Sequence, residues 1–94
     1  MPRVKYAPAA IRDLQRLREF LQSKNPLAAR RSAEVIMKSL KILGNQPQVG
    51  RAIEDMPEEF REWIIEFGDS GYIARYRFDG HDVTILGLRH QKEV

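Results

Sequence analysis

The spacing of the apolar residues changes once along this chain, and that change constrains the fold more than any other feature. Between Ile11 and Leu43 apolar side chains recur every three or four residues, which is the spacing of amphipathic helices. From Trp63 onward the inward-facing residues come at every second position, which is the spacing of half-buried strands. Helices followed by antiparallel strands predict the α+β class.

Two helices are expected, and they should form an antiparallel hairpin. Pro8 suits the first turn of a helix that ends near Ser23. Asn25 followed by Pro26 combines a capping residue with a first-turn proline, so a second helix starts there, and Gly44-Asn45 and Pro47 close it. So short a connection makes the two helices neighbours. Their apolar stripes should contain Ile11, Leu14, Leu17, Phe20, Leu21, Ala29, Ala33, Ile36, Met37, Leu40 and Leu43.

The strands lie on either side of the helices in the sequence. Residues 3–6 alternate as a short half-buried strand, and residues 46–60 read as a loop with an acidic stretch. A three-stranded antiparallel meander should follow, with strands near residues 63–67, 72–78 and 81–89 and a turn at residues 68–71. The predicted architecture is strand, helix, helix and meander, with the helical hairpin on one face of a small sheet. It forms a single domain over residues 1–94.

The Asp79-Gly80 dipeptide predicts the register of the last hairpin. It is a strong signal for a two-residue turn, because a type I′ turn needs positive φ at both positions. Such a turn pairs Phe78 with His81, Arg77 with Asp82, and Arg75 with Thr84. The face toward the helices should then carry Tyr72, Ala74, Tyr76, Phe78, Val83 and Ile85. The other face should carry Glu62, Ile64, Glu66, Ile73, Arg75, Arg77, Asp82, Thr84, Leu86, Leu88 and His90.

The second face is the candidate working surface, because no other element of the chain is expected to cover it. Its charges roughly cancel, so it lacks the one-signed field of a phosphate-binding groove. The formal net charge of +3 is also unevenly distributed. Residues 1–45 hold ten basic and three acidic side chains, net +7, whereas residues 46–94 hold six basic and ten acidic, net −4. Each half is expected to meet a different partner.

Composition excludes several other classes of protein. The chain has no cysteine, so neither a disulfide nor a Cys-based zinc site is expected. No apolar run approaches the roughly 20 residues of a membrane-spanning helix, and the N-terminus lacks the apolar core of a signal peptide. We therefore expect a soluble cytoplasmic protein without a cofactor or a metal, and without contact with a membrane.

Five residues near the working face are candidates for binding a partner: Arg75, Arg77, Arg89, His90 and Lys92. Arg75 is the stronger candidate of the first two, because Arg77 has a predicted ion pair with Asp82. His90 is either an acid–base group or a strand-end histidine bonded to backbone. Arg89 and Lys92 are either solvated charges or part of a positive tail that docks onto an acidic surface.

Smaller features are interpreted as structural. Gly50, within Val49-Gly50-Arg51, should supply a turn, and Arg51 should pair with the acidic loop. Met37 and Trp63 are expected in the core.

The order of these features resembles the RelE/ParE superfamily of toxins from bacterial type II toxin–antitoxin systems, over essentially the whole chain. The segments that carry the resemblance are YAPAAIRDLQRLREFL, KNPLAARRSAEVI, VGR, GYIARYRFDG and VTILGLRHQKE. Membership implies a small cytoplasmic toxin that a cognate antitoxin neutralises by wrapping around it. RelE-like members cut messenger RNA on the ribosome and need basic groups on the open face of the sheet. ParE-like members bind DNA gyrase and lack that set.

Several residues depart from the RelE-like pattern. Two lysines usual on the first meander strand correspond to Ile64 and Glu66, and a usual arginine corresponds to Ile73. His90 is followed by Gln91, where some relatives pair a histidine with a tyrosine. These departures favour a ParE-like, non-enzymatic toxin that poisons DNA gyrase.

Two alternatives stay open. One is a ribosome-dependent endoribonuclease acting on ribosome and mRNA, with Arg75, Arg77 and His90 for positioning and proton transfer and Arg61 or Lys92 as phosphate contacts. The other is a non-toxic member that only binds its antitoxin within a repressor complex.

Overall fold

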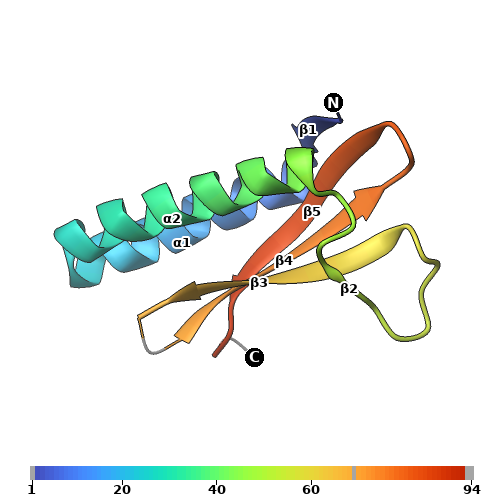
Figure 1. Ribbon diagram of the computed structural model, residues 1–94. Coiled ribbons are helices and arrows are strands. Elements are labelled where there is room, and N and C mark those ends of the chain that lie inside the picture. The colour runs from blue at the N-terminus through green and yellow to red at the C-terminus, as the bar shows by residue number, and fades with distance from the viewer. Residues whose placement is uncertain (1, 69, 93–94) are drawn as a thin grey trace.

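Both helices lie on one side of a five-stranded sheet in the computed structural model, which describes residues 2–68 and 70–92 (Figure 1). This arrangement confirms the predicted α+β class. The sheet order is β1-β5-β4-β3-β2, in which β1 runs parallel to β5 and every other pair is antiparallel. Along the chain the elements are β1 (Arg3–Tyr6), α1 (Pro8–Lys24), α2 (Pro26–Asn45), β2 (Arg51–Ala52), β3 (Phe60–Phe67), β4 (Ser70–Phe78) and β5 (Asp82–His90).

The helix boundaries follow the predicted signals. The Asn25 side chain accepts hydrogen bonds from the backbone N–H groups of Leu27 and Ala28, at 3.1 and 3.2 Å, so it caps α2 as expected. α2 ends at Asn45, within the predicted signal of Gly44-Asn45 and Pro47. Gly44 also serves packing, since a Cβ there would lie 3.1 Å from the Val4 side chain. Neither helix, within the described residues, is long and apolar enough to cross a membrane.

The core lies between the helices and the sheet, and it uses a narrower stripe of each helix than the sequence predicts. Its buried residues are Ala10, Leu17, Ile36, Leu40, Leu43, Ile65, Tyr72, Ala74, Tyr76, Val83, Ile85 and Leu88. Trp63 packs against this cluster, as predicted. Met37 was expected in the core, yet 49% of it is exposed, and Ile11 and Phe20 are also about half exposed. These three side chains lie at the edges of their helices, where the packed stripe has ended.

The turn between β4 and β5 is wider than predicted. Phe78 pairs with Val83, so four residues separate the paired positions and the expected pairs of Phe78 with His81 and Arg77 with Asp82 do not form. The Asp79 carboxylate accepts hydrogen bonds from the backbone N–H groups of His81 and Asp82, at 2.9 and 2.8 Å. These bonds stabilise the wider turn, a local effect that asparagine and aspartate side chains commonly have.

A β-bulge in β5 changes the faces of the residues that follow it. Tyr76 pairs with Ile85, but Arg75 pairs with Gly87, so Leu86 is an extra residue in β5 and the expected pair of Arg75 with Thr84 is absent. Leu88 then lies opposite Ala74 and is buried, and His90 lies opposite Tyr72. The prediction that Leu88 and His90 share the uncovered face with Arg75 is therefore wrong.

Side chains of α1 hold the bulge in place. Pairing between β1 and β5 ends at Ile85, so the next residues of β5 have a neighbouring strand, β4, on one side only. Asp13 accepts a hydrogen bond from the Leu88 N–H at 2.9 Å, and Arg16 donates one to the Leu88 carbonyl at 3.4 Å. Asp13 and Arg16 also pair with each other at 3.6 Å. The two side chains thus satisfy backbone groups that a neighbouring strand would otherwise satisfy.

The segment between α2 and β3 is anchored by a buried tyrosine. The Tyr76 hydroxyl donates to the Pro47 carbonyl at 2.8 Å and accepts from the Gly50 N–H at 2.9 Å. Burial raises the pKa of Tyr76, so the hydroxyl keeps the proton that it donates. Gly50 is structural, as predicted, but because of close packing: a Cβ there would lie 2.6 Å from the Tyr76 hydroxyl. Arg61 completes the anchor by donating to the Gly50 carbonyl at 2.8 Å.

Two further details of the segment differ from prediction. β2 forms within the expected loop and pairs with the start of β3. Arg51 pairs with Glu62 on β3 rather than with the acidic loop. At the next turn β3 ends at Phe67 and β4 begins at Ser70, two residues earlier than expected, and Asp69 of that turn lies outside the described residues.

We expect Tyr76→Phe to lower the free energy of unfolding by about 1–3 kcal/mol, because it leaves the Gly50 N–H and the Pro47 carbonyl without a buried partner. Urea unfolding followed by circular dichroism measures the change. Tyr6→Phe is the control, since the Tyr6 hydroxyl makes no hydrogen bond with a described residue, and it should change stability by less than about 0.5 kcal/mol. Equal losses in both variants would contradict the anchoring role.

Asp13→Ala should lower the free energy of unfolding by about 1–3 kcal/mol, because the Leu88 N–H loses its partner at the bulge. Hydrogen exchange of the Leu88 amide should speed up in the same variant. Glu19→Ala provides the comparison on α1, since Glu19 is exposed and makes no ion pair with a described residue. A stable variant with slow exchange at Leu88 would show that Asp13 does not hold the bulge.

Candidate functional site

The open face, meaning the side of the sheet opposite the helices, has its arginines bound to carboxylates. Glu62 sits between two of them: its Oε2 is 3.3 Å from Arg75 and its Oε1 is 3.4 Å from Arg51. Glu62 and Arg75 are directly opposed on β3 and β4. Arg75 was expected to lack a directly opposed partner, and that expectation is wrong because it considered only the β5 side of the strand.

Arg77 and Asp82 also have partners, but not each other. The Arg77 Nε lies 2.7 Å from Glu59, just before β3, and its Nη1 lies 3.9 Å from Asp79. Asp82 pairs instead with Lys5 at 2.8 Å and with Arg3 at 3.7 Å, both on β1. The hydrogen bond from Lys5 lowers the pKa of Asp82, with help from the nearby positive charges. Each of these cations of the open face therefore lies within ion-pair distance of a carboxylate of the same chain.

Arg89 is an exception among the cations of the open face. It lies opposite Ile73, its side chain is exposed, and among residues 2–68 and 70–92 it makes no ion pair. It lines a shallow hollow of about 350 Å³ beside the bulge, together with Arg16, Glu62, Arg75 and other residues. Arg75, Arg77 and Arg89 are thus the predicted partner-binding residues that share the open face.

His90 and Lys92 lie on the helix-covered side. The Nδ1 of His90 accepts a hydrogen bond from the Lys92 N–H at 3.1 Å, so a proton on Nε2 can be donated to the Ser70 hydroxyl at 2.9 Å. The ring also meets the edge of Tyr72, with centroids 5.4 Å apart. The interpretation of His90 as a strand-end histidine bonded to backbone is confirmed. Both residues line a hollow of about 440 Å³ with Arg16, Leu17, Phe20, Leu21 and Tyr72.

The four residues proposed for RNA cleavage are not brought together. Arg75 and Arg77 lie on the open face, whereas His90 lies on the opposite face. Arg61 is directed to the loop that it anchors and donates to the carbonyls of Gln48 and Gly50. No side chain with an acid–base role in the predicted set therefore stands beside Arg75.

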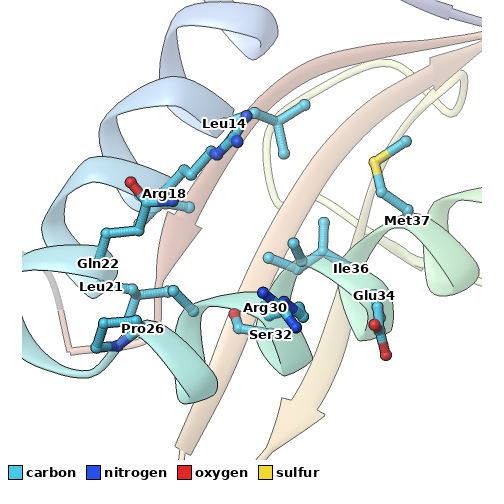
Figure 2. Close-up of a pocket in the computed structure, with 13 residues that line it drawn as sticks. Leu14, Arg18, Leu21, Gln22, Pro26, Arg30, Ser32, Glu34, Ile36 and Met37 are labelled. Carbon is cyan, nitrogen blue, oxygen red and sulfur yellow. The ribbon is translucent and has the colours of Figure 1, made fainter.

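A second surface, on the helical hairpin, was only partly predicted. A hollow of about 520 Å³ lies between α1 and α2, and Figure 2 shows Leu14, Ile36 and Met37 at its wall, with Arg18 and Arg30 also drawn around it. The half-exposed Met37 also lines a second hollow, between α2 and β1.

Seven cations of the helices are exposed and make no ion pair with a residue that the structure describes: Arg12, Arg18, Lys24, Arg30, Arg31, Lys38 and Lys41. The charge on the helices is thus available to a partner, whereas the charge on the sheet is mostly neutralised within the chain. The uneven charge along the sequence predicted this contrast. The pairing of Glu59 and Glu62 with the arginines of β4 was not predicted from the sequence. The pair of Glu62 with Arg75 could have been predicted from the register of β3 against β4.

Comparisons with known proteins agree with this architecture. The family described as ParE toxin of type II toxin-antitoxin system, parDE, matches residues 4–94. Toxin RelE3 of Caulobacter vibrioides is 33% identical over 93 residues, which is 99% of this chain and 98% of that protein. Toxin RelE1 of the same organism is 34% identical over 84 residues, covering 89% of this chain and 87% of that protein.

A solved structure has the same fold. A chain described as the chromosomal ParDE TA system from P. aeruginosa matches with a TM-score of 0.80 and 22% identity, over 96% of each chain. The resemblance predicted from the sequence motifs is confirmed by the family match and by both relatives. The chain belongs to the ParE toxin family of type II toxin–antitoxin systems.

Proposed function

We propose that this toxin arrests growth by poisoning DNA gyrase in the cytoplasm, and that a cognate antitoxin holds it inactive. The observation that carries the proposal is the neutralised open face: Arg75 and Arg77, which an RNA-cleaving toxin would need free, are bound to Glu62 and Glu59. Cleavage of a phosphodiester requires positive groups to offset the charge that develops in the transition state. A protein target has no such requirement.

The position of His90 also supports a protein target. Both ring nitrogens are engaged, one by the Lys92 N–H and one by the Ser70 hydroxyl. A general acid or base must reach the proton that it transfers, and His90 faces away from Arg75. The proposal thus treats Arg75, Arg77 and Arg89 as one contact surface, and His90 and Lys92 as part of another.

A ribosome-dependent endoribonuclease is kept as the second candidate because the two curated relatives are named RelE toxins. The separation of Arg75 and Arg77 from His90 and Arg61 counts against it.

The purified toxin should inhibit supercoiling by purified gyrase and increase double-strand cleavage of the plasmid, while transcripts stay intact in a translating extract. The physical reason is that the arginines of the open face are bound to carboxylates. Cut transcripts together with fully active gyrase would contradict the proposal and support the endoribonuclease. If the toxin affects neither gyrase nor transcripts, and its expression causes no growth defect, both candidate functions are contradicted. That result would support a member that only binds its antitoxin.

The hollow between α1 and α2 is proposed as part of the antitoxin-binding surface. It combines an apolar wall with exposed cations: Met37 is 49% exposed, and Arg18 and Arg30 lie on the rim. A groove of this kind suits an amphipathic helix with acidic flanks, because the apolar wall supplies affinity and the cations orient the partner.

Met37→Glu should weaken the complex with the co-purified antitoxin about 30-fold, which corresponds to about 2 kcal/mol for a central apolar contact. Isothermal titration calorimetry measures the dissociation constant. Met56→Glu is the matched control, because Met56 is also exposed, at 37%, but lies in the loop between β2 and β3. If Met56→Glu weakens the complex as much as Met37→Glu does, the antitoxin does not bind through this hollow.

A further inference from the structure

We infer that Glu59 and Glu62 occupy a latent binding site for single-stranded nucleic acid, formed by Arg51, Arg75 and Arg77, and exclude that ligand from it. The inference deepens the proposed function and rests on it in one respect: the native toxin does not bind RNA on its open face. The ligand is defined by its chemistry, a chain of phosphodiesters. Glu59 and Glu62 would then decide which class of target the fold can engage.

The three arginines form a corner that a flexible phosphate chain can follow, with Arg75 between Arg77 along β4 and Arg51 across β3. Arg75 and Arg77 are two residues apart on β4, so their side chains leave the same face at positions about 7 Å apart along the strand. Arg51 reaches the same face from β2, on the far side of Glu62. Their side chains are 61%, 49% and 42% exposed for Arg51, Arg75 and Arg77, so a ligand can reach all three.

The carboxylates already hold the groups that a phosphate would use. Glu62 divides its two oxygens between Arg51 and Arg75, and its side chain is only 16% exposed. Glu59 binds the Nε of Arg77 at 2.7 Å. A phosphate approaching any of these guanidinium groups meets a negative charge within ion-pair distance of the same group, and like charges repel. At each of the three arginines, a glutamate of the same chain therefore competes with a phosphate for the guanidinium group.

Two neighbouring glutamates provide matched controls. Glu58 precedes Glu59 in the chain, and Glu66 follows Glu62 on the same face of β3. Both are exposed, and neither pairs with a cation of the described part of the chain. Replacing either by glutamine raises the net charge as much as replacing Glu59 or Glu62 does, but releases no arginine.

The experiment compares two double variants, E59Q/E62Q and E58Q/E66Q, by fluorescence anisotropy with a labelled oligouridylate between about 50 and 200 mM salt. Glutamine keeps the volume of glutamate and removes its charge. We expect E59Q/E62Q to bind at least about tenfold more tightly than E58Q/E66Q at the lower salt concentration. The slope of log K against log salt should be steeper by about 1.4 to 2.1, as two or three new phosphate contacts on a single strand require.

The cations of the helical hairpin are present in every variant, so their background binding cancels in the comparison. Adding R51Q, R75Q and R77Q to E59Q/E62Q should abolish the gain. An equal gain in both double variants, or no gain in E59Q/E62Q, would overturn the inference. Circular dichroism and thermal melting check folding, and if E59Q/E62Q unfolds, the single variant E62Q is compared with E66Q in the same way.

A deoxyoligonucleotide arm separates the two sources of phosphodiester. Equal gains with both strands indicate recognition of phosphate alone, and a larger gain with RNA indicates a contact to the 2′-hydroxyl. Both results support the inference. The proposed function is tested separately, because gyrase inhibition is measured on the native toxin. If the native toxin does not inhibit gyrase, the proposed function fails. A gain of binding in E59Q/E62Q would still support the release of the arginines.

Discussion

The β-bulge in β5 determines which side chains of the strand end face the helices and which face the open side of the sheet. Leu86 is an extra residue there, and the next backbone groups are held by α1, through Asp13 and Arg16 on Leu88. This contact decides on which face of the sheet each later side chain lies. It buries Leu88 and turns His90 toward Tyr72 instead of toward Arg75. A single extra residue thus places on opposite faces two side chains that a regular hairpin would place on the same face.

That separation gives the two sides of the molecule different electrostatic characters. On the open face Glu59, Glu62 and Asp82 are bound to nearby cations, so little charge remains to attract a phosphate chain. On the helices seven exposed cations make no ion pair with the described residues, and an apolar hollow runs between α1 and α2. Such a division suits the proposed function, in which the helices bind the antitoxin and the open face contacts a protein target.

Features that depend on nearby residues could be predicted from the sequence. The change of apolar spacing gave the order of elements, and Asn25 with Pro26 gave the restart of the helix. Features that depend on distant residues could not. The bulge needs contacts between Asp13 and Leu88, which are far apart in the chain, and the ion pair of Arg75 needs the β3–β4 register. The wider turn at Asp79 shows that one side chain can override a strong dipeptide signal.

The most direct test of the central claim, that the bulge places Arg75 and His90 on opposite faces, is a nuclear Overhauser measurement on the labelled toxin. The account predicts cross-peaks from the His90 ring protons to the Tyr72 ring and to the Leu17 methyl groups, which line the same hollow. Cross-peaks from His90 to Ile73, without any to Tyr72, would contradict it. They would place His90 on the same face of the sheet as the arginines.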